Sequence, residues 1–353
     1  MKVLIASLPI GTGHDIAARA LTESCLTRGF EVEFSHHLVG RARWETAMYF
    51  LTIHRLPALY AAAFRQADRS EMVWRRHRQN WRRVGQNLLD EVYQAHRPDV
   101  VLATHPFALS AWAALRERRP SLRLVAVLTD LSVHRFWFEP LADAYAVWLP
   151  EQVEELRRYG VPSERIWPTG IPIRASFQNG NLFSRYRQGP IILLGGGLGF
   201  GPYYRILKQL SGLPHPVLAI CGHNEKLRWQ LDQHRWPERV TVLGYVDHMP
   251  ELLRQSRMVV GKPGGVTAAE VAQSQVPWVV THWIPGQEQI NRDRLIAHDL
   301  AVRGDTNLQA VAIELLRDGS FARQKMLEGQ RLWARPLAAD HIVERLAGMT
   351  SKS

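Results

Sequence analysis

Short apolar runs alternate with longer segments of helical periodicity along almost the whole chain. Runs of strand length lie at 3–7, 31–35, 100–103, 124–128 and 144–148, and again at 191–194, 217–221, 240–243, 258–260 and 278–281. Helical patterns at 15–28, 152–159 and 267–275 fall between them. Apolar runs joined by helices are typical of parallel sheets covered on both faces. Two such sets predict an α/β protein with two doubly wound domains, whose ligands bind at the carboxyl ends of the strands.

A Gly/Pro-rich segment separates the two sets. Residues 169–173 read Thr-Gly-Ile-Pro-Ile, and a polar stretch follows at 178–181. A chain of 353 residues also exceeds the usual size of one hydrophobic core. We expect a first domain at 1–169, a linker at 170–187, a second domain at 188–335, and a C-terminal helix within 336–353 that crosses back onto the first domain.

The net charge of +11 is concentrated in one stretch. Between Arg41 and Arg83 there are ten arginines against three acidic residues. Such a patch indicates a polyanionic partner, either nucleic acid or anionic lipid. No RNP, KH or zinc-finger pattern supports nucleic acid, which we therefore do not expect as a partner.

An aromatic and amphipathic pattern runs through this basic stretch. A helical stripe of Trp74, His77, Trp81, Val84 and Leu88 is flanked by Arg75, Arg76, Arg78, Arg82 and Arg83, and Trp44, Tyr49, Phe50, Leu51, Ile53 and Leu56 precede it. This composition suits an element that lies on an anionic membrane surface. A core helix with a solvated basic back gives the same stripe.

Other features limit the class of protein. Cys25 and Cys221 lie far apart, which fits a reducing cytoplasm better than a disulfide framework. No apolar run reaches the roughly 18 residues that a membrane span needs. The apolar start runs into Gly13 and His14 without a small-residue cleavage site, so we interpret it as a strand rather than a signal peptide.

Two glycine-rich turns in the second half each follow an apolar run and precede a helical pattern. Residues 195–201 read Gly-Gly-Gly-Leu-Gly-Phe-Gly, and 261–265 read Gly-Lys-Pro-Gly-Gly, with Glu270 one turn into the next helix. Glycines let backbone N–H groups approach an anion, and a helix start adds a positive field. Neither turn matches the dinucleotide fingerprint or the P-loop. The turns indicate an anion site, although glycine turns also serve packing alone.

The segment 285–291 reads Pro-Gly-Gln-Glu-Gln-Ile-Asn, and its amide and carboxylate groups suit sugar hydroxyls. The chain has no Asp-x-Asp pair that would hold a metal against a diphosphate. Positive helix ends would have to neutralise that charge instead. We therefore expect no metal and no other cofactor.

A series of short motifs occurs in a fixed order over most of the chain. In that order they are Gly11-Thr12-Gly13-His14-x-x-Ala17-Ala18, Thr129-Asp130 with His134 and Trp137, Gly170-Ile171-Pro172, Gly195-Gly196-Gly197-x-Gly199, Cys221-Gly222-His223-Asn224, Gly244-Tyr245-Val246-x-x-Met249, the turn from Lys262 to Glu270, and Pro285-Gly286-Gln287-Glu288-x-x-Asn291. Each is common alone. Together they resemble the family of monogalactosyldiacylglycerol synthases and processive diacylglycerol glucosyltransferases, and more distantly the N-acetylglucosaminyltransferase of peptidoglycan lipid synthesis.

The resemblance implies a GT-B fold, in which two facing Rossmann-like doubly wound domains enclose an interdomain cleft. It implies an inverting glycosyltransferase that moves a hexose from a UDP-sugar to a diacylglycerol-type membrane lipid. Galactose and glucose are the expected sugars, and N-acetylglucosamine and glucuronic acid stay open. The chain is shorter than many relatives, which puts processive addition of several sugars in doubt.

The resemblance also implies roles on the donor side. Gly197, Gly199, Gly264 and Gly265 would sit against the diphosphate with Thr267 beside them, Tyr245, Val246 and Met249 would frame the uracil, Glu270 would bind the ribose, and Gln287, Glu288 and Asn291 would bind the transferred sugar. Glu270 at a helix start has a second interpretation, as a carboxylate that complements the helix dipole.

On the acceptor side the resemblance makes His14, which follows Gly13, the catalytic base. A histidine suits this role because its pKa lies near the operating pH. His14 alternatively caps its loop or positions the acceptor. Asp130 would orient a histidine or the acceptor, or cap a strand end, and His134 and Trp137 would contact the acceptor or pack the loop.

The basic aromatic stretch lies where this family carries its membrane-docking and acceptor segment. The resemblance therefore favours a membrane surface over a core helix, with Trp74, Trp81, Arg75 and Arg82 among the contacts. It places the protein in the cytoplasm, attached peripherally to the inner face of the membrane.

Three alternatives remain at this point. The same fold serves nucleotide-sugar 2-epimerases, which act on the free sugar nucleotide and need no membrane element. A different acceptor, such as a polyprenyl-linked sugar, fits the same donor residues. The third is a non-catalytic lipid-surface protein, whose donor residues would be expected to have decayed.

Overall fold

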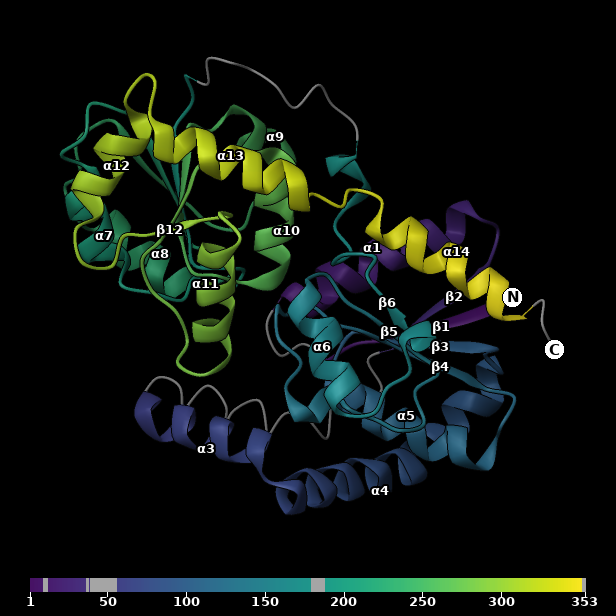
Figure 1. Cartoon of the computed structure of the whole chain (residues 1–353). Helices are drawn as coiled ribbons and strands as arrows, with labels where there is room; N and C mark the ends of the chain where they lie inside the picture. Colours follow the sequence, from purple (N-terminus) through teal and green to yellow (C-terminus); the bar gives the residue numbers. More distant parts are fainter. Residues whose placement is uncertain (9–11, 36–37, 39–55, 179–187, 351–353) are drawn as a thin grey trace.

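The computed structural model describes residues 1–8, 12–35, 38, 56–178 and 188–350. Within them, two six-stranded parallel sheets form, one in each half of the chain, and helices cover both faces of each sheet (Figure 1). The predicted α/β fold with two doubly wound domains is confirmed. All ten predicted strands are present, and two short edge strands were missed because runs of two residues carry no periodicity.

The first sheet has the strand order β2-β1-β3-β4-β5-β6, and every neighbouring pair is parallel. Its strands are β1 (Lys2–Ala6), β2 (Glu31–Ser35), β3 (Val100–Ala103), β4 (Arg123–Val127), β5 (Ala144–Ala146) and β6 (Ile166–Trp167). The order reverses between β1 and β3, and in open parallel sheets ligands bind at the carboxyl ends beside such a switch point. The loops after β1 and β3 carry His14 and His105.

The helices of the first half are α1 (Gly13–Thr27), α3 (Pro57–Arg69), α4 (Glu71–His96), α5 (Pro106–Arg118) and α6 (Pro150–Arg158), with short 3₁₀ turns η1 (Arg135–Trp137), η2 (Ser163–Arg165) and η3 (Ala175–Phe177). Helix α4 packs along α5, and Gly85 is required there because a Cβ atom would clash with the Ala111 backbone. Helix α3 leaves this body and lies below the second half (Figure 1).

The second sheet has the order β12-β11-β10-β7-β8-β9, again all parallel. Its strands are β7 (Ile191–Leu194), β8 (Val217–Ile220), β9 (Val240–Leu243), β10 (Met258–Gly261), β11 (Trp278–Val280) and β12 (Val302–Arg303). The order reverses between β7 and β10. Both strands end in a glycine-rich turn, so the two turns lie side by side at the switch point.

The helices of the second half are α7 (Tyr203–Leu210), α8 (Glu225–Asp232), α9 (Met249–Gln255), α10 (Gly265–Ser274), α11 (Gln287–Ala297), α12 (Leu308–Leu316) and α13 (Phe321–Trp333). The last helix, α14 (Ala338–Thr350), returns to the first half (Figure 1). There Ile342, Val343 and Leu346 are fully buried in the core that contains β1 and β3. The Ser24 hydroxyl also donates to Asp340 across 2.5 Å.

Helix α4 corrects one expectation. Trp74 and Trp81 belong to the buried interior: the Trp74 indole donates to the Phe138 carbonyl at 3.0 Å, and Trp81 stacks on Phe107 with ring centres 4.8 Å apart. Both are therefore core residues rather than exposed side chains, and Trp81 also borders the cavity between the two halves. Leu88 is exposed and Leu89 is fully buried in its place, because the buried face of a 26-residue helix that covers α5 drifts from the stripe in the sequence. Trp44, Tyr49, Phe50, Leu51 and Ile53 lie outside the described residues.

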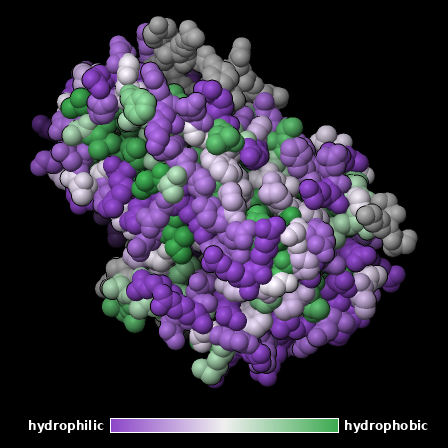
Figure 2. All heavy atoms as spheres, viewed as in Figure 1, coloured by the Kyte–Doolittle hydropathy of each residue, from purple (hydrophilic) through white to green (hydrophobic). Residues whose placement is uncertain are grey.

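Some apolar side chains of this region do face solvent. Leu56, Leu59 and Met72 are each more than half exposed, and Figure 2 shows apolar spheres along the lower edge of the molecule, over α3 and the start of α4. Among the described residues, none of the helices combines the length and the apolar character needed to cross a bilayer.

Candidate active site

A cavity of about 990 Å³ lies between the two halves, at the carboxyl ends of both sheets. Loops after β1, β3 and β4 and helices α3 and α4 line it from the first half, and the two glycine turns, α9 and the start of α11 line it from the second. Of the predicted site residues, it is lined by Gly13, His14, Trp81, Asp130, His134, Trp137, Gly197, Tyr245, Val246, Met249, Gly264, Gly265, Thr267, Glu270, Gln287 and Glu288.

His14 lies in the first turn of α1 and lines this cavity. Its Nδ1 atom lies 2.6 Å from the Thr104 carbonyl oxygen and 2.9 Å from the Thr129 hydroxyl. A carbonyl oxygen only accepts hydrogen bonds, so Nδ1 carries the hydrogen and Nε2 keeps its lone pair. Burial lowers the pKa of His14, and the neighbouring Asp130 carboxylate opposes that shift. This is the state that a general base requires.

Asp130 does not hydrogen-bond His14. Its carboxylate instead accepts hydrogen bonds from two amides of the second half, those of Gln287 and Asn291, the latter at 3.3 Å. Burial raises the pKa of Asp130, and the adjacent His14 opposes the rise. Asp130 thus links the loop beside His14 to the segment predicted to bind a sugar.

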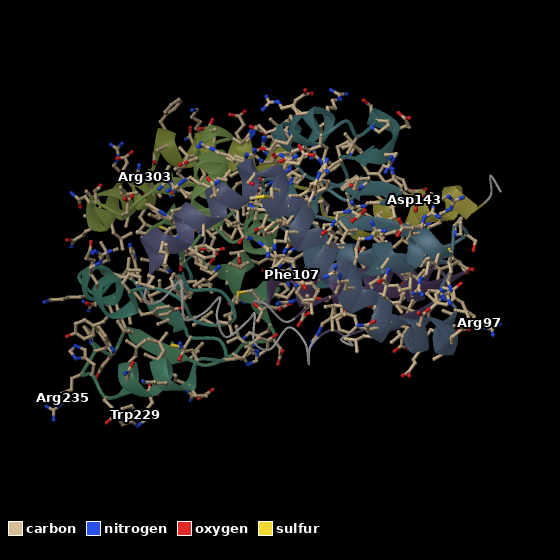
Figure 3. All side chains as sticks on the ribbon, turned by 90° about the horizontal axis from the view of Figure 1, so that it is seen from below. Arg97, Phe107, Asp143, Trp229, Arg235 and Arg303 are labelled. Atoms are coloured by element: carbon tan, nitrogen blue, oxygen red, sulfur yellow. The ribbon has the colours of Figure 1, made fainter. Side chains whose placement is uncertain are left out.

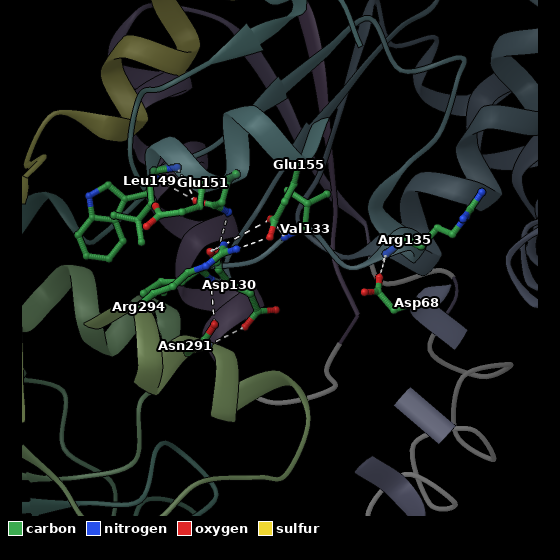
Figure 4. A network of polar contacts seen from close by, with 12 residues as sticks. Asp68, Asp130, Val133, Arg135, Leu149, Glu151, Glu155, Asn291 and Arg294 are labelled. Atoms are coloured by element: carbon green, nitrogen blue, oxygen red, sulfur yellow. Dashed lines mark hydrogen bonds and ion pairs between the residues drawn. The ribbon is translucent and has the colours of Figure 1, made fainter. Parts of the chain in front are cut away.

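Asn291 is fully buried and does not line the cavity, which corrects its expected role in donor binding. Its side chain accepts from the Leu131 N–H at 3.0 Å and donates to the Pro263 carbonyl at 3.1 Å as well as to Asp130. Figure 4 shows the contact between Asn291 and Asp130 beside the ion pair between Arg294 and Glu155. Asn291 therefore joins the two halves.

The glycine turns approach the first half closely. The Gly197 N–H donates to the Thr12 hydroxyl at 3.2 Å, and a Cβ atom at Gly265 would clash with the Thr129 carbonyl oxygen. Gly199 has a positive φ of 57° and packs against the Cys221 backbone, and it does not line the cavity. We therefore correct the expectation that Gly199 contacts a diphosphate: it shapes the turn that presents Gly197.

Glu270 lines the cavity as a buried carboxylate. Its Oε1 atom has no hydrogen-bond partner among the described residues, and the Arg174 guanidinium approaches only to 4.0 Å. Burial raises the pKa of Glu270 to about 7. A buried polar atom without a partner costs about 1–3 kcal/mol, so Glu270 is prepared for a ligand that supplies one.

The remaining donor-side residues line the same wall. Tyr245 stacks on His223 with ring centres 4.2 Å apart, and Val246 and Met249 follow it. The Glu288 carboxylate forms an ion pair with Lys262 and accepts from the Ile284 N–H at 2.8 Å. The sequence predicted no role for Lys262, whose ammonium nitrogen lies beside Gly196 of the first glycine turn and Gly264 of the second.

The part of the cavity that the first half lines is aromatic. Phe64 of α3 packs on His134 at 4.2 Å between ring centres, and His134 also hydrogen-bonds the Phe64 carbonyl at 3.1 Å. Figure 3, viewed from the side of α3 and α4, places Phe107 near the centre of this region. This wall is lined by Leu59, Tyr60, Phe64, His77, Trp81, Phe107, Phe136 and Trp137.

Two predicted surface residues lie elsewhere. Arg75 pairs with Glu71 and Arg82 with Glu117, and neither lines the cavity. Arg78, expected on a solvated face, forms a buried ion pair with Glu139 at 2.8 Å. In the part of the chain that the structure describes, no three His, Cys, Asp or Glu side chains gather as metal ligands would.

Known proteins match this architecture and sequence. The family model described as monogalactosyldiacylglycerol (MGDG) synthase matches residues 14–173. Processive diacylglycerol beta-glucosyltransferases of Bacillus cereus and Bacillus thuringiensis are 28% and 29% identical, and each alignment covers 98% of this chain and 93% of the relative. The chain is a glycosyltransferase related to the MGDG synthases.

Solved structures of this glycosyltransferase fold superimpose over nearly the full length. They include MurG of Acinetobacter baumannii (TM-score 0.63, 15% identity, 98% of this chain and 99% of that one) and the glycosyltransferase SnogD of Streptomyces nogalater (0.65, 16%, 99% and 100%). A third is a co-structure of S. aureus MnaA with UDP (0.61, 15%, 99% and 97%). The GT-B fold implied by the motifs is confirmed.

The motifs of this MGDG-synthase relative located most of the cavity. Thr12 and Lys262 stand inside the motifs but had no predicted role, and Arg174 lies just beyond the Gly170-Ile171-Pro172 motif; all three line the cavity. The motifs also did not predict that α3 lines the cavity. An aromatic residue on an amphipathic helix gives the same sequence pattern whether it faces a core or a cavity.

Proposed function

We propose that this glycosyltransferase transfers a hexose, galactose or glucose, from a UDP-sugar to a diacylglycerol-type lipid with inversion at the anomeric carbon. The observation that carries the proposal is the shared cavity: His14, with a free Nε2 lone pair, lines it from the first half, and the two glycine turns and Glu270 line it from the second. Relatives named as diacylglycerol glucosyltransferases support the acceptor class.

The donor would lie along the second half. The partnerless oxygen of Glu270 suits ribose hydroxyls, and Tyr245, Val246 and Met249 would frame the uracil. Gly197 and the Gly264–Gly265 turn would bring backbone N–H groups to the diphosphate at the start of α10. A structure of the same fold that is described with UDP supports this class of ligand.

In the chemical step the acceptor hydroxyl oxygen forms a bond to the anomeric carbon while the bond from that carbon to the diphosphate oxygen breaks. The hydroxyl proton passes to Nε2 of His14, and such a base contributes roughly 10²–10⁴-fold. Negative charge develops on the departing diphosphate. We expect Lys262, the turn amides and the α10 dipole to stabilise that charge without a metal.

The acceptor would enter along the aromatic wall. Tyr60, Phe64, Trp81 and Phe107 offer apolar surface for the glyceride part of a lipid, whereas a free sugar nucleotide has no apolar part to bury there. The exposed Leu56, Leu59 and Met72 lie at the edge of the same wall and would contact the membrane, with Arg75 and Arg76 near anionic headgroups.

The test is transfer of radiolabel from a panel of UDP-sugars to diacylglycerol in anionic vesicles. We expect label in the organic phase from one hexose and a loss of 10²-fold or more in His14→Gln, which keeps the size of the side chain. Unchanged UDP affinity of the variant by isothermal titration would show that its donor site is intact.

Each of three other outcomes of this assay would support a different function. Conversion of a UDP-sugar without any lipid, with no labelled lipid, would replace the proposal with an epimerase. UDP binding without labelled diacylglycerol from any sugar would move the acceptor to a polyprenyl-linked or other glycolipid. Absence of UDP binding would indicate a non-catalytic protein on this scaffold.

A further inference from the structure

Three consecutive residues after β4 touch both halves of the active site. The Thr129 hydroxyl contacts Nδ1 of His14 at 2.9 Å. The next residue, Asp130, accepts hydrogen bonds from Gln287 and Asn291 of the second half. Leu131 donates its N–H to Asn291 and accepts from Arg294 through its carbonyl oxygen.

The base and the donor half are thus attached to one short loop. Gln152 fixes the same loop from the first half by donating to the Asp130 carbonyl at 2.9 Å, so the loop backbone is held and the Asp130 carboxylate is directed by its partners. Asn291 is well placed to direct it, because Asn291 is fully buried and its side chain has three partners.

The charges around the pair are few. His14 is faced by Asp130, by Asp15 on its own helix, and by the His105 ring at 4.7 Å. Asp130 is faced by His14 and, from the second half, by Glu288, which Lys262 pairs. Asp130 is therefore the main negative charge acting on His14, and its position depends on the second half.

We propose that Asn291 is a positioning residue that holds Asp130 beside His14, so that the base gains its carboxylate neighbour only when the two halves are closed. The inference rests on the proposed role of His14 as base. It gives a buried residue that does not line the cavity a part in the reaction. Closure of the donor half onto its ligand would place the Asp130 carboxylate beside His14 and so strengthen the base.

The primary test is NMR titration of the His14 ring in protein with ¹³C-labelled histidine, with His14→Gln for assignment. Asp130→Asn removes the negative charge and should lower the pKa of His14. Asn291→Ala should lower it in the same direction, and the double variant should show no further shift, because both changes act through one carboxylate. This readout needs no acceptor.

A matched control separates positioning from general loosening of the halves. His298 also joins the halves, but its partner Glu151, at 2.8 Å, belongs to α6 and not to the loop after β4. His298→Ala should leave the pKa of His14 unchanged. In the lipid-transfer assay Asn291→Ala should lower kcat by about tenfold or more, less than loss of the base itself, with the donor KM within about threefold.

The inference is overturned if Asn291→Ala leaves the pKa of His14 unchanged, if the effects of Asn291→Ala and Asp130→Asn add, or if His298→Ala gives the same shift. In each case Asn291 would be a structural contact only. Absence of labelled lipid with wild-type protein would instead contradict the proposed function, while the NMR result would still decide the positioning of Asp130.

Discussion

Glu270 is a carboxyl group that the fold keeps away from water, with one oxygen that lacks a partner among the described residues. Burial favours its neutral form and raises its pKa to about 7. At neutral pH the group can therefore both donate and accept hydrogen bonds, which suits a pair of adjacent hydroxyls. The same shift links the folded state to pH.

Glu270→Gln tests that linkage. Because the pKa of Glu270 is higher in the folded state, the contribution of its neutral form to the stability of wild type is fully present below pH 4.5. This contribution is lost as the pH rises through about 7. The free energy of unfolding of Glu270→Gln, relative to wild type, should therefore rise between pH 5 and pH 8 by up to about 3 kcal/mol. Urea denaturation at both values measures it, and a pH-independent difference would contradict the burial of a titrating carboxyl.

Gly265 is a residue whose missing side chain permits the two halves to meet. Gly265→Ala would place a Cβ atom against the Thr129 carbonyl oxygen. We expect a loss of about 1–3 kcal/mol in stability from this overlap, together with weaker UDP binding by calorimetry. The matched variant Gly348→Ala, within α14, meets no atom within 4 Å and should leave stability unchanged or raise it by up to about 1 kcal/mol. Equal effects of the two would contradict the close approach.

At the scale of elements, α3 and α4 have different roles, although the sequence predicted one membrane-binding element for this region. Helix α4 provides core through Trp74 and Trp81, and α3 provides part of the cavity wall through Phe64. The exposed large apolar side chains in and next to these two helices are Leu56, Leu59, Met72 and Leu88.

Trp81→Ala should lower the free energy of unfolding by about 3–5 kcal/mol, since it removes a buried aromatic ring. Met72→Ala, at the second residue of the same helix, should change it by less than about 0.5 kcal/mol because Met72 is 74% exposed. Chemical denaturation compares them. A small effect of Trp81→Ala would restore Trp81 as a surface residue.

The double variant Leu56→Ser and Met72→Ser tests the proposed membrane face. We expect its binding to anionic vesicles in a sedimentation assay to fall about tenfold or more, since each buried apolar side chain is worth about 1.5–3 kcal/mol. Its thermal stability should stay close to wild type. Unchanged vesicle binding would move the membrane contact to another surface.

At the scale of the whole molecule, α14 makes the first half depend on the end of the chain. Ile342, Val343 and Leu346 complete the core over β1 and β3, and Trp148 donates to the Trp333 carbonyl at 2.8 Å just before the crossing. The two halves are therefore joined by the packing of α14 as well as by the contacts around the cavity.

Ile342→Ala should cost about 2–5 kcal/mol because it opens a cavity in the first half. Ile313→Ala is the matched control, since Ile313 is 55% exposed on α12, and it should have little effect. Thermal unfolding with a probe in each half would show whether both halves respond. If Ile342→Ala were neutral, α14 would not contribute to the core.

The sequence by itself determined the strands longer than two residues, several of the helices and the glycine turns, because apolar periodicity and glycine have local physical causes. It also determined that His14, Glu270 and both turns would meet at strand ends, since parallel sheets gather such loops at one edge. Only the tertiary structure decided the rest. Trp74, Gly199 and Asn291 are buried, and Asp130 accepts hydrogen bonds from the other half. These contacts join residues far apart in the chain, so no local spacing predicts them.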